Sequence, residues 1–272
     1  MSSSRSALLD ARDRGGAALI GYLPTGFPTV DGSIAALGAM VDAGVDVIEV
    51  GLPYSDPVMD GPTIQRATEQ ALAGGTRTSD TLRVVEAVAA KGLPVLVMSY
   101  WNPIERYGVA AFSRDLAAAG GAGLITPDLV PEEAGEWVAA SDEHGLDQVF
   151  LVAPSSTEAR VSSTVAACRG FVYAAAVMGV TGAREAISTL APDLVARVRR
   201  TSDLPVGVGL GVRDGEQAAA VAAYADAVIV GSAFVSRLLD ADDSASGVRA
   251  VHALAGELAA GVRRPAAAGA GR

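Results

Sequence analysis

The chain has 272 residues, of which 50% are hydrophobic and 5% aromatic, and its formal net charge is −10. The length allows one large α/β domain or two small ones. The negative charge and the scarcity of aromatic side chains argue against nucleic acid as a partner. No apolar run approaches the roughly 18 residues of a membrane-spanning helix, so we expect no membrane contact.

The N-terminal segment predicts a cytoplasmic location. It contains Arg5, Asp10 and Arg12, where a secretory signal would need an uninterrupted apolar core.

Eight short apolar runs rich in β-branched residues recur along the chain, at residues 17–23, 45–51, 93–100, 121–129, 147–154, 170–177, 204–211 and 225–233. Ala-rich segments with helical spacing separate them, and Gly44, Gly92 and Gly120 are placed to end helices. Strands that alternate with helices form a parallel sheet. Eight such units predict an α/β fold of the closed (β/α)₈ type, the TIM barrel, with an open doubly wound sheet as the alternative.

No linker-like change of composition interrupts this series. We therefore expect a single barrel domain over residues 1–262, with an extra helix at its N-terminus. The last segment, RRPAAAGAGR (263–272), lacks the apolar content to pack and is expected to be disordered.

Two acids mark the second run and the loop after it. Glu49 lies inside VDVIEVG (45–51), and Asp60 follows in GLPYSDPVMDGP. Aligning the second run with ADAVIVG (225–231) sets Glu49 against Ile229. A strand of the same pattern thus carries an aliphatic residue at this position, so folding does not require an acid there. Burial of a carboxyl raises its pKa, which makes Glu49 a candidate acid/base catalyst at the barrel mouth, with Asp60 beside it. A buried ion pair and ordinary turn chemistry are the structural alternatives.

Three late strand ends are rich in glycine: GVTG (179–182), GVGLG (207–211) and GSA (231–233). Unobstructed backbone N–H groups near helix starts, with the Ser232 hydroxyl as a further donor, form a site for an anion. Barrels often bind phosphate at the loops after strands seven and eight. No Lys or Arg lies inside these clusters, so we expect backbone dipoles and hydroxyls to hold a phosphate. Close packing or tight turns are the alternative.

The sequence lacks the residues that other catalytic mechanisms would require. His144 and His252 fall in predicted helices away from the strand ends, so no metal site is predicted and a Ser nucleophile would have no base. Lys91, the only lysine, ends a helix, which argues against Schiff-base chemistry. The lone Cys168 cannot form an internal disulfide, and redox chemistry is not expected.

The run IEVGLPYSDPVMDGPTIQRA (48–67) resembles the signature of the tryptophan synthase alpha chain family. GYLPTGFPT, SYWNPI, PDLVPEE, GVTG, GVGLG and VGSA also fall in the order expected of that family, so the resemblance covers about residues 15–240. It implies a carbon–carbon lyase that cleaves indole-3-glycerol phosphate into indole and glyceraldehyde 3-phosphate by a retro-aldol reaction.

The resemblance also implies roles for residues. Glu49 would shuttle both protons, and Asp60 would stabilise positive charge on the indole ring. The implied substrate-binding residues are Tyr22, Leu52, Ile64, Tyr100 and Val208 as apolar wall, Tyr173 near the two acids, Thr181, and Gly182, Gly209, Gly231 and Ser232 at the phosphate.

No metal or organic cofactor is implied for this chain. Family members pass indole to a pyridoxal-phosphate-dependent beta chain for L-tryptophan synthesis, in an α₂β₂ heterotetramer. The loop 52–60 and the exposed segment 101–104, which begins with Trp101, would form the docking surface. The loop ending at GVTG would act as a lid.

Two rival functions share the predicted fold. One is another phosphate-binding barrel isomerase or lyase, and the other is a non-catalytic partner that only binds a phosphorylated ligand. The pair of Glu49 and Asp60 with its flanking motif argues against the first. Glu49 argues against the second, because a binding protein has no use for an unpaired buried acid.

Overall fold

The computed structural model describes residues 3–176 and 184–264. Within these residues the strands are β1 (Ala18–Pro24), β2 (Val47–Gly51), β3 (Val95–Met98), β4 (Gly123–Thr126), β5 (Asp147–Val152), β6 (Val172–Ala175), β7 (Val206–Gly209) and β8 (Ala227–Val230). Each strand pairs in parallel with the next, and β8 pairs with β1, so the sheet closes. The prediction of a (β/α)₈ barrel is confirmed.

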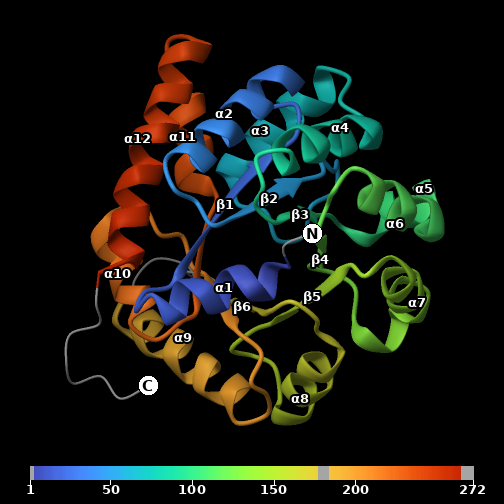
Figure 1. Cartoon of the computed structure of the whole chain (residues 1–272), viewed down its shortest axis with the longest axis vertical. Coiled ribbons are helices and arrows are strands. Elements are labelled where there is room, and N and C mark those ends of the chain that lie inside the picture. The colour runs from blue at the N-terminus through green and yellow to red at the C-terminus, as the bar shows by residue number, and fades with distance from the viewer. Residues whose placement is uncertain (1–2, 177–183, 265–272) are drawn as a thin grey trace.

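Helices surround the strands (Figure 1). They are α2 (Val30–Asp42), α3 (Pro62–Ala73), α4 (Thr78–Ala89), α5 (Trp101–Tyr107), α6 (Val109–Ala118), α7 (Gly135–His144), α8 (Glu158–Ala167), α9 (Arg184–Arg199), α10 (Gly215–Ala222), α11 (Ser232–Leu239) and α12 (Ser244–Val262). Gly44, Gly92 and Gly120 follow helices with φ of +101°, +90° and +81°, a conformation that favours glycine. The predicted helix ends are therefore confirmed at these three positions.

Alternation along each strand divides the core into two parts. Ile20, Val47 and Phe171 point into the barrel, whereas Ile48 and Val50 pack against the helices. This follows from the period of two in a strand and explains why the strands are apolar on both faces.

The expected N-terminal helix, α1 (Ser4–Asp13), closes the bottom of the barrel. Its Leu8 and Ala11 join the interior cluster, and the helix crosses the strand ends in Figure 1. Ser4 fixes its start, because the backbone N–H and the hydroxyl of Ser4 donate to Asp147 Oδ2 at 3.1 and 2.5 Å.

Two aspartates at the bottom of the barrel support the alignment of the second and eighth strands. Asp46 Oδ2 accepts the N–H of Leu19 in the preceding strand at 2.9 Å, and Asp226 Oδ2 accepts the N–H of Val206 in the same way at 2.9 Å. The two strands therefore begin alike and differ where Glu49 replaces an aliphatic residue.

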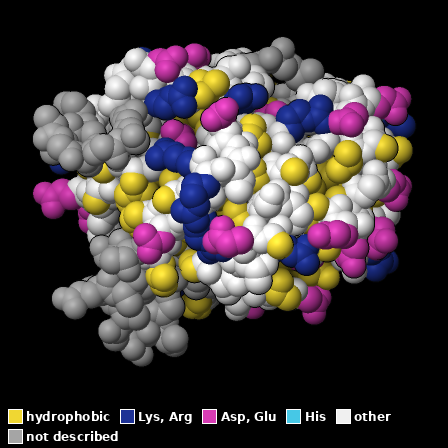
Figure 2. Space-filling view, turned by 90° about the horizontal axis from the view of Figure 1, so that it is seen from below, with side chains coloured by type: hydrophobic (Ala, Val, Ile, Leu, Met, Phe, Trp, Pro, Cys, Tyr) yellow, Lys and Arg dark blue, Asp and Glu magenta, His cyan; other side chains and the backbone are white. Residues whose placement is uncertain are grey.

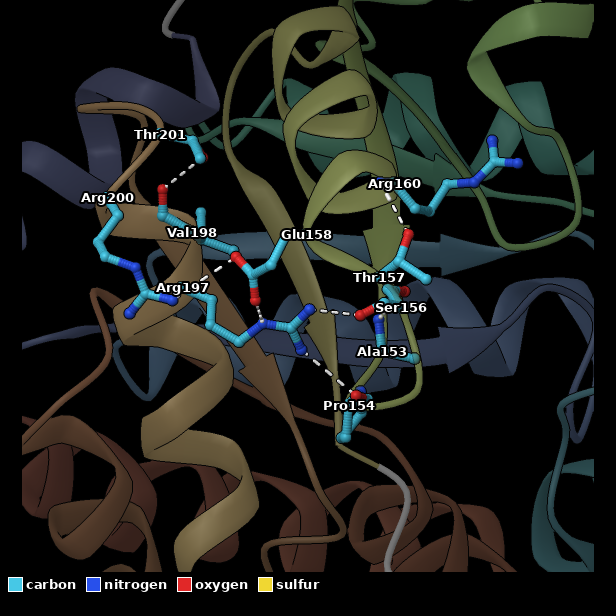
Figure 3. Close-up of polar contacts among 10 residues, drawn as sticks. All are labelled: Ala153, Pro154, Ser156, Thr157, Glu158, Arg160, Arg197, Val198, Arg200 and Thr201. Carbon is cyan, nitrogen blue, oxygen red and sulfur yellow. Dashed lines mark hydrogen bonds and ion pairs between the residues drawn. The ribbon is translucent and has the colours of Figure 1, made fainter.

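A half-buried arginine ties α9 to the loop after β5 (Figure 3). The Arg197 side chain is 17% exposed, and its Nε donates to Glu158 Oε1 at 2.5 Å. Its two terminal nitrogens donate to the carbonyl oxygens of Pro154 and Ser156. One side chain thus satisfies two loop carbonyls and joins α8 to α9.

The face drawn in Figure 2 mixes acidic and basic side chains, with small apolar areas between them. In the part of the chain that the structure describes, no helix is both long and apolar enough to cross a membrane. The predicted tail lies mostly outside the described residues, so the division of the chain at residue 262 stays a prediction.

Candidate active site

A cavity of about 500 Å³ opens at the end of the barrel to which the strands point. This is the end at which barrel enzymes carry their chemistry. Its described lining residues are Tyr22, Glu49, Met59, Asp60, Gly61, Pro62, Thr63, Ile64, Met98, Tyr173, Ala176, Gly209, Leu210, Gly211, Arg213, Ile229, Gly231 and Ser232.

Glu49 lies at the inner wall of this cavity. Its side chain points into the barrel between Tyr22 and Leu96, its partners in the strand register, and only 1% of the residue is exposed. Glu49 Oε2 has no hydrogen-bond partner among the described residues. Burial, and then the nearby charge of Asp60, raise the pKa of Glu49 to about 8. The carboxyl is therefore largely protonated at neutral pH and can act as an acid.

Asp60 enters the cavity from the loop after β2. Two contacts fix this loop: Gln65 Nε2 donates to the Asp60 carbonyl at 2.7 Å, and the Met59 N–H donates to Tyr100 Oη at 3.0 Å. Burial raises the pKa of Asp60, and a hydrogen bond from the Tyr100 hydroxyl works in the opposite direction. Asp60 thus differs from Glu49 in having a donor that stabilises its charged form.

Two tyrosines complete the inner wall. Burial, and then the charges of Asp60 and Glu49, raise the pKa values of Tyr22 and Tyr173 well above the usual range, so both phenols stay neutral donors. Glycine makes room for the Tyr22 ring: a Cβ on Gly231 would lie 3.0 Å from Tyr22 Cδ1, and one on Gly51 would overlap the Tyr22 hydroxyl.

Another part of the cavity wall, next to the two tyrosines, is rich in glycine. Gly209 ends β7, Gly231 follows β8, and Ser232 begins α11, so unobstructed backbone and a helix start meet in the cavity. These groups suit an anion. The predicted Thr181 and Gly182 lie outside the described residues.

Three predicted wall residues do not line this cavity. Val208 is fully buried against the helices, because alternation in β7 turns Gly207 and Gly209 inward and Val208 outward. Leu52 and Tyr100 instead line a much smaller cavity of about 10 Å³ behind Asp60. Tyr100 supports the Asp60 loop from there.

Sequence reasoning missed several lining residues, of which three bear on the chemistry. Leu210 takes the wall position expected of Val208, Met98 ends β3, and Arg213 brings a cation to the mouth. The available signal for Arg213 was its position just after the last glycine of GVGLG, at the start of a helix.

The segments predicted to form the docking surface are partly exposed. Val58 and Met59, in the loop after β2, are 76% and 42% exposed, and Val130 after β4 is 37% exposed. Trp101, expected to be exposed, is only partly so, because it packs against the helix-facing core as α5 begins. Ile104 is fully buried. The exposed apolar side chains therefore lie mainly on the loops on either side of Trp101.

Comparison with known proteins gives consistent results. A family model described as tryptophan synthase alpha chain matches residues 8–263. The tryptophan synthase alpha chain of Salinispora tropica is 65% identical over 266 residues, which cover 98% of this chain and 100% of that protein. That of Mycobacterium avium is 65% identical over 257 residues, covering 94% and 93%.

Solved structures agree with these relatives. A structure of Mycobacterium tuberculosis tryptophan synthase has a TM-score of 0.90 at 60% identity and covers 97% of this chain and 100% of that chain. The alpha subunit from Legionella pneumophila has a TM-score of 0.87 at 31% identity, with coverages of 96% and 98%.

The barrel, the buried acid and the glycine-rich wall define a (β/α)₈-barrel enzyme equipped for acid–base chemistry on an anionic substrate. Within that class, the chain belongs to the tryptophan synthase alpha chain family. It is therefore a lyase that catalyses the alpha reaction, the cleavage of indole-3-glycerol phosphate, and its partner is a tryptophan synthase beta chain.

Proposed function

We propose that Glu49 and Asp60 carry out the alpha reaction directly. The observation that carries this proposal is the Glu49 carboxyl, which is 1% exposed, lacks a partner for Oε2 among the described residues, and has its pKa raised to about 8 beside Asp60. An acid that is protonated at neutral pH and free to donate suits proton transfer to carbon.

Glu49 is proposed to move both protons of the reaction. It donates its proton to the indole C3, which turns that carbon into a leaving group. The resulting carboxylate takes the proton of the C3′ hydroxyl as the carbonyl forms and the C3–C3′ bond breaks, and the electron pair of that bond returns to the ring. Indole and glyceraldehyde 3-phosphate result, and Glu49 ends protonated as it began.

Asp60 is proposed to stabilise the charge that this step creates. Protonation at C3 leaves positive charge on the ring nitrogen, and a carboxylate near the N–H lowers the energy of that state. The hydrogen bond from Tyr100 favours the charged form of Asp60, which this role requires.

The remaining contacts of the substrate follow from the two walls. Tyr22, Ile64 and Leu210 offer apolar surface for indole, and the phosphate would lie at Gly209, Gly231 and Ser232, with Thr181 and Gly182 as further proposed contacts. The steps use protein groups alone, so the chain needs no organic cofactor. Because a phosphate ester does not cross membranes unaided, we also propose a cytoplasmic location.

The beta chain is proposed to dock over the loops after β2, β3 and β4, in an α₂β₂ heterotetramer. These strands are neighbours in the barrel, and Val58, Met59 and Val130 expose apolar side chains on the first and third loops. Exposed apolar residues on adjacent loops are typical of an interaction surface. Pyridoxal phosphate would belong to the beta chain, to which indole passes.

Release of indole from indole-3-glycerol phosphate by the purified chain, alone and with a beta chain, tests the function. We expect Asp60→Asn to lower kcat about 100-fold, as loss of an electrostatic stabiliser does. Glu86→Gln, on the exposed face of α4, is the control and should keep full activity. Absence of release by the wild-type chain in both conditions would overturn the proposal.

A further inference from the structure

We propose that Arg213 binds the phosphate of the substrate at the mouth of the cavity and thereby selects phosphorylated substrates. This proposal rests on the phosphate site proposed above. Arg213 lies two residues after Gly211 and lines the same cavity as Gly231 and Ser232. A guanidinium at this position would add a charged donor to a site otherwise made of backbone N–H groups and a hydroxyl.

The backbone that carries Arg213 is held at the start of α10. The Arg213 N–H donates to Gln217 Oε1 at 3.0 Å, and the Gln217 N–H donates to Asp214 Oδ1 at 2.8 Å. The next N–H, of Gly215, donates to Glu257 Oε1 at 2.9 Å. These side chains are thus bonded to backbone N–H groups, which fixes the backbone of Arg213 beside the cavity.

Arg213 differs from three arginines at the end of α9. Arg197, Arg199 and Arg200 form ion pairs with Glu158 or Asp226, and packing or loop contacts account for them. Within residues 3–176 and 184–264, no carboxylate forms an ion pair with Arg213, which is exposed. Its charge is therefore available to a ligand.

The charges around the cavity explain why a cation would matter there. Glu49 and Asp60 line the cavity, the chain as a whole carries a charge of −10, and the substrate brings a phosphate of up to two negative charges. Among the described lining residues, Arg213 is the only cation. One positive charge about 4 Å from the phosphate in a largely aqueous setting is worth about a tenfold difference in affinity.

The test compares Arg213→Ala and Arg213→Lys with the wild-type chain in the complex with a beta chain. Arg237→Ala is the matched control, because Arg237 is an exposed residue of α11 that does not line the cavity. The measurements are KM and kcat for indole-3-glycerol phosphate, and the Kd values of glyceraldehyde 3-phosphate and of indole. Thermal unfolding of each variant checks its fold.

We expect Arg213→Ala to raise KM and the Kd of glyceraldehyde 3-phosphate about tenfold, with kcat within about twofold and the Kd of indole unchanged. Arg213→Lys should keep most of the affinity, and the salt dependence of KM should weaken in Arg213→Ala. Values equal to those of Arg237→Ala would overturn the role of Arg213, as would an equal loss of indole affinity. Failure of the proposed function would instead appear in the wild-type chain, as no indole release and no binding of glyceraldehyde 3-phosphate.

Discussion

A Cβ atom on Gly209 would lie 2.7 Å from the hydroxyl oxygen of Tyr173 and 3.1 Å from its Cε1. The two residues lie on adjacent strands, β7 and β6, and both face the cavity. Gly209 therefore leaves space for the Tyr173 ring and also exposes backbone at the proposed phosphate site. Glycines at a strand end of this barrel can therefore make room for an aromatic ring as well as for a ligand.

Gly209→Ala is expected to displace the Tyr173 ring, cost about 1–3 kcal/mol of stability and lower kcat/KM. Adding Tyr173→Phe removes the shortest of the contacts and should restore part of both losses. A double-mutant cycle on the free energy of unfolding and on kcat/KM measures this coupling. Strictly additive effects would contradict the direct relationship between the two residues.

The stability of the chain should depend on Glu49 and on pH. Its pKa is about 8 in the folded chain against 4.5 when free, so the folded state binds this proton more tightly. The stabilisation is present below about pH 4.5 and is lost as pH rises through 8. We therefore expect Glu49→Gln, which cannot ionise, to gain stability relative to wild type as pH rises across this window.

Urea denaturation at several pH values measures this difference between Glu49→Gln and the wild-type chain. Glu86→Gln removes an exposed carboxyl and serves as the control. A stability difference for Glu49→Gln that is the same at pH 5.5 and 8.5 would show that Glu49 keeps an ordinary pKa.

Tyr100→Phe should reduce kcat by roughly tenfold, because it removes the hydroxyl that accepts the Met59 N–H and donates to Asp60. Loss of that donor raises the pKa of Asp60 further, so the acid limb of the rate profile should move to higher pH. Tyr107→Phe breaks another Tyr–Asp hydrogen bond, to Asp115 at 2.8 Å, away from the cavity, and should change neither property. Identical pH profiles for Tyr100→Phe and wild type would contradict the positioning role.

Arg197→Met should lower the free energy of unfolding by about 1–3 kcal/mol, because it leaves the carbonyl oxygens of Pro154 and Ser156 without their donor. Arg160→Met breaks the exposed pair with Glu132 and should cost under about 1 kcal/mol. Chemical denaturation of both variants gives the comparison. Equal costs would mean that the carbonyl contacts of Arg197 add nothing beyond a surface ion pair.

The parts of the fold that follow from local pattern could be predicted from the sequence. The eight apolar runs, the glycines that end helices, and the contrast between Glu49 and Ile229 each depend on strand period and composition, and the closed barrel contains them as expected. The placement of Glu49 and Asp60 in one cavity likewise follows from the rule that the loops after the strands share one end of a barrel.

The finer structure of the cavity depended on details that a linear pattern does not contain. Val208 and Leu210 differ by two positions, but β7 ends at Gly209, so Leu210 leaves the strand alternation and reaches the cavity. Tyr100 lies behind Asp60 because the loop after β2 folds over it, which only the three-dimensional path determines. For the same reason, the sequence did not predict that Arg213, just before α10, lines the cavity.

The central claim is that Glu49 supplies the proton chemistry of the cleavage, and single-turnover reaction of Glu49→Gln tests it most directly. The variant is mixed in excess with indole-3-glycerol phosphate, and binding of the substrate and formation of indole are followed in the same sample. We predict substrate affinity within a few-fold of wild type and indole formation slowed by about 1,000-fold or more. Indole formation at a rate near that of wild type, with the substrate bound, would contradict the account.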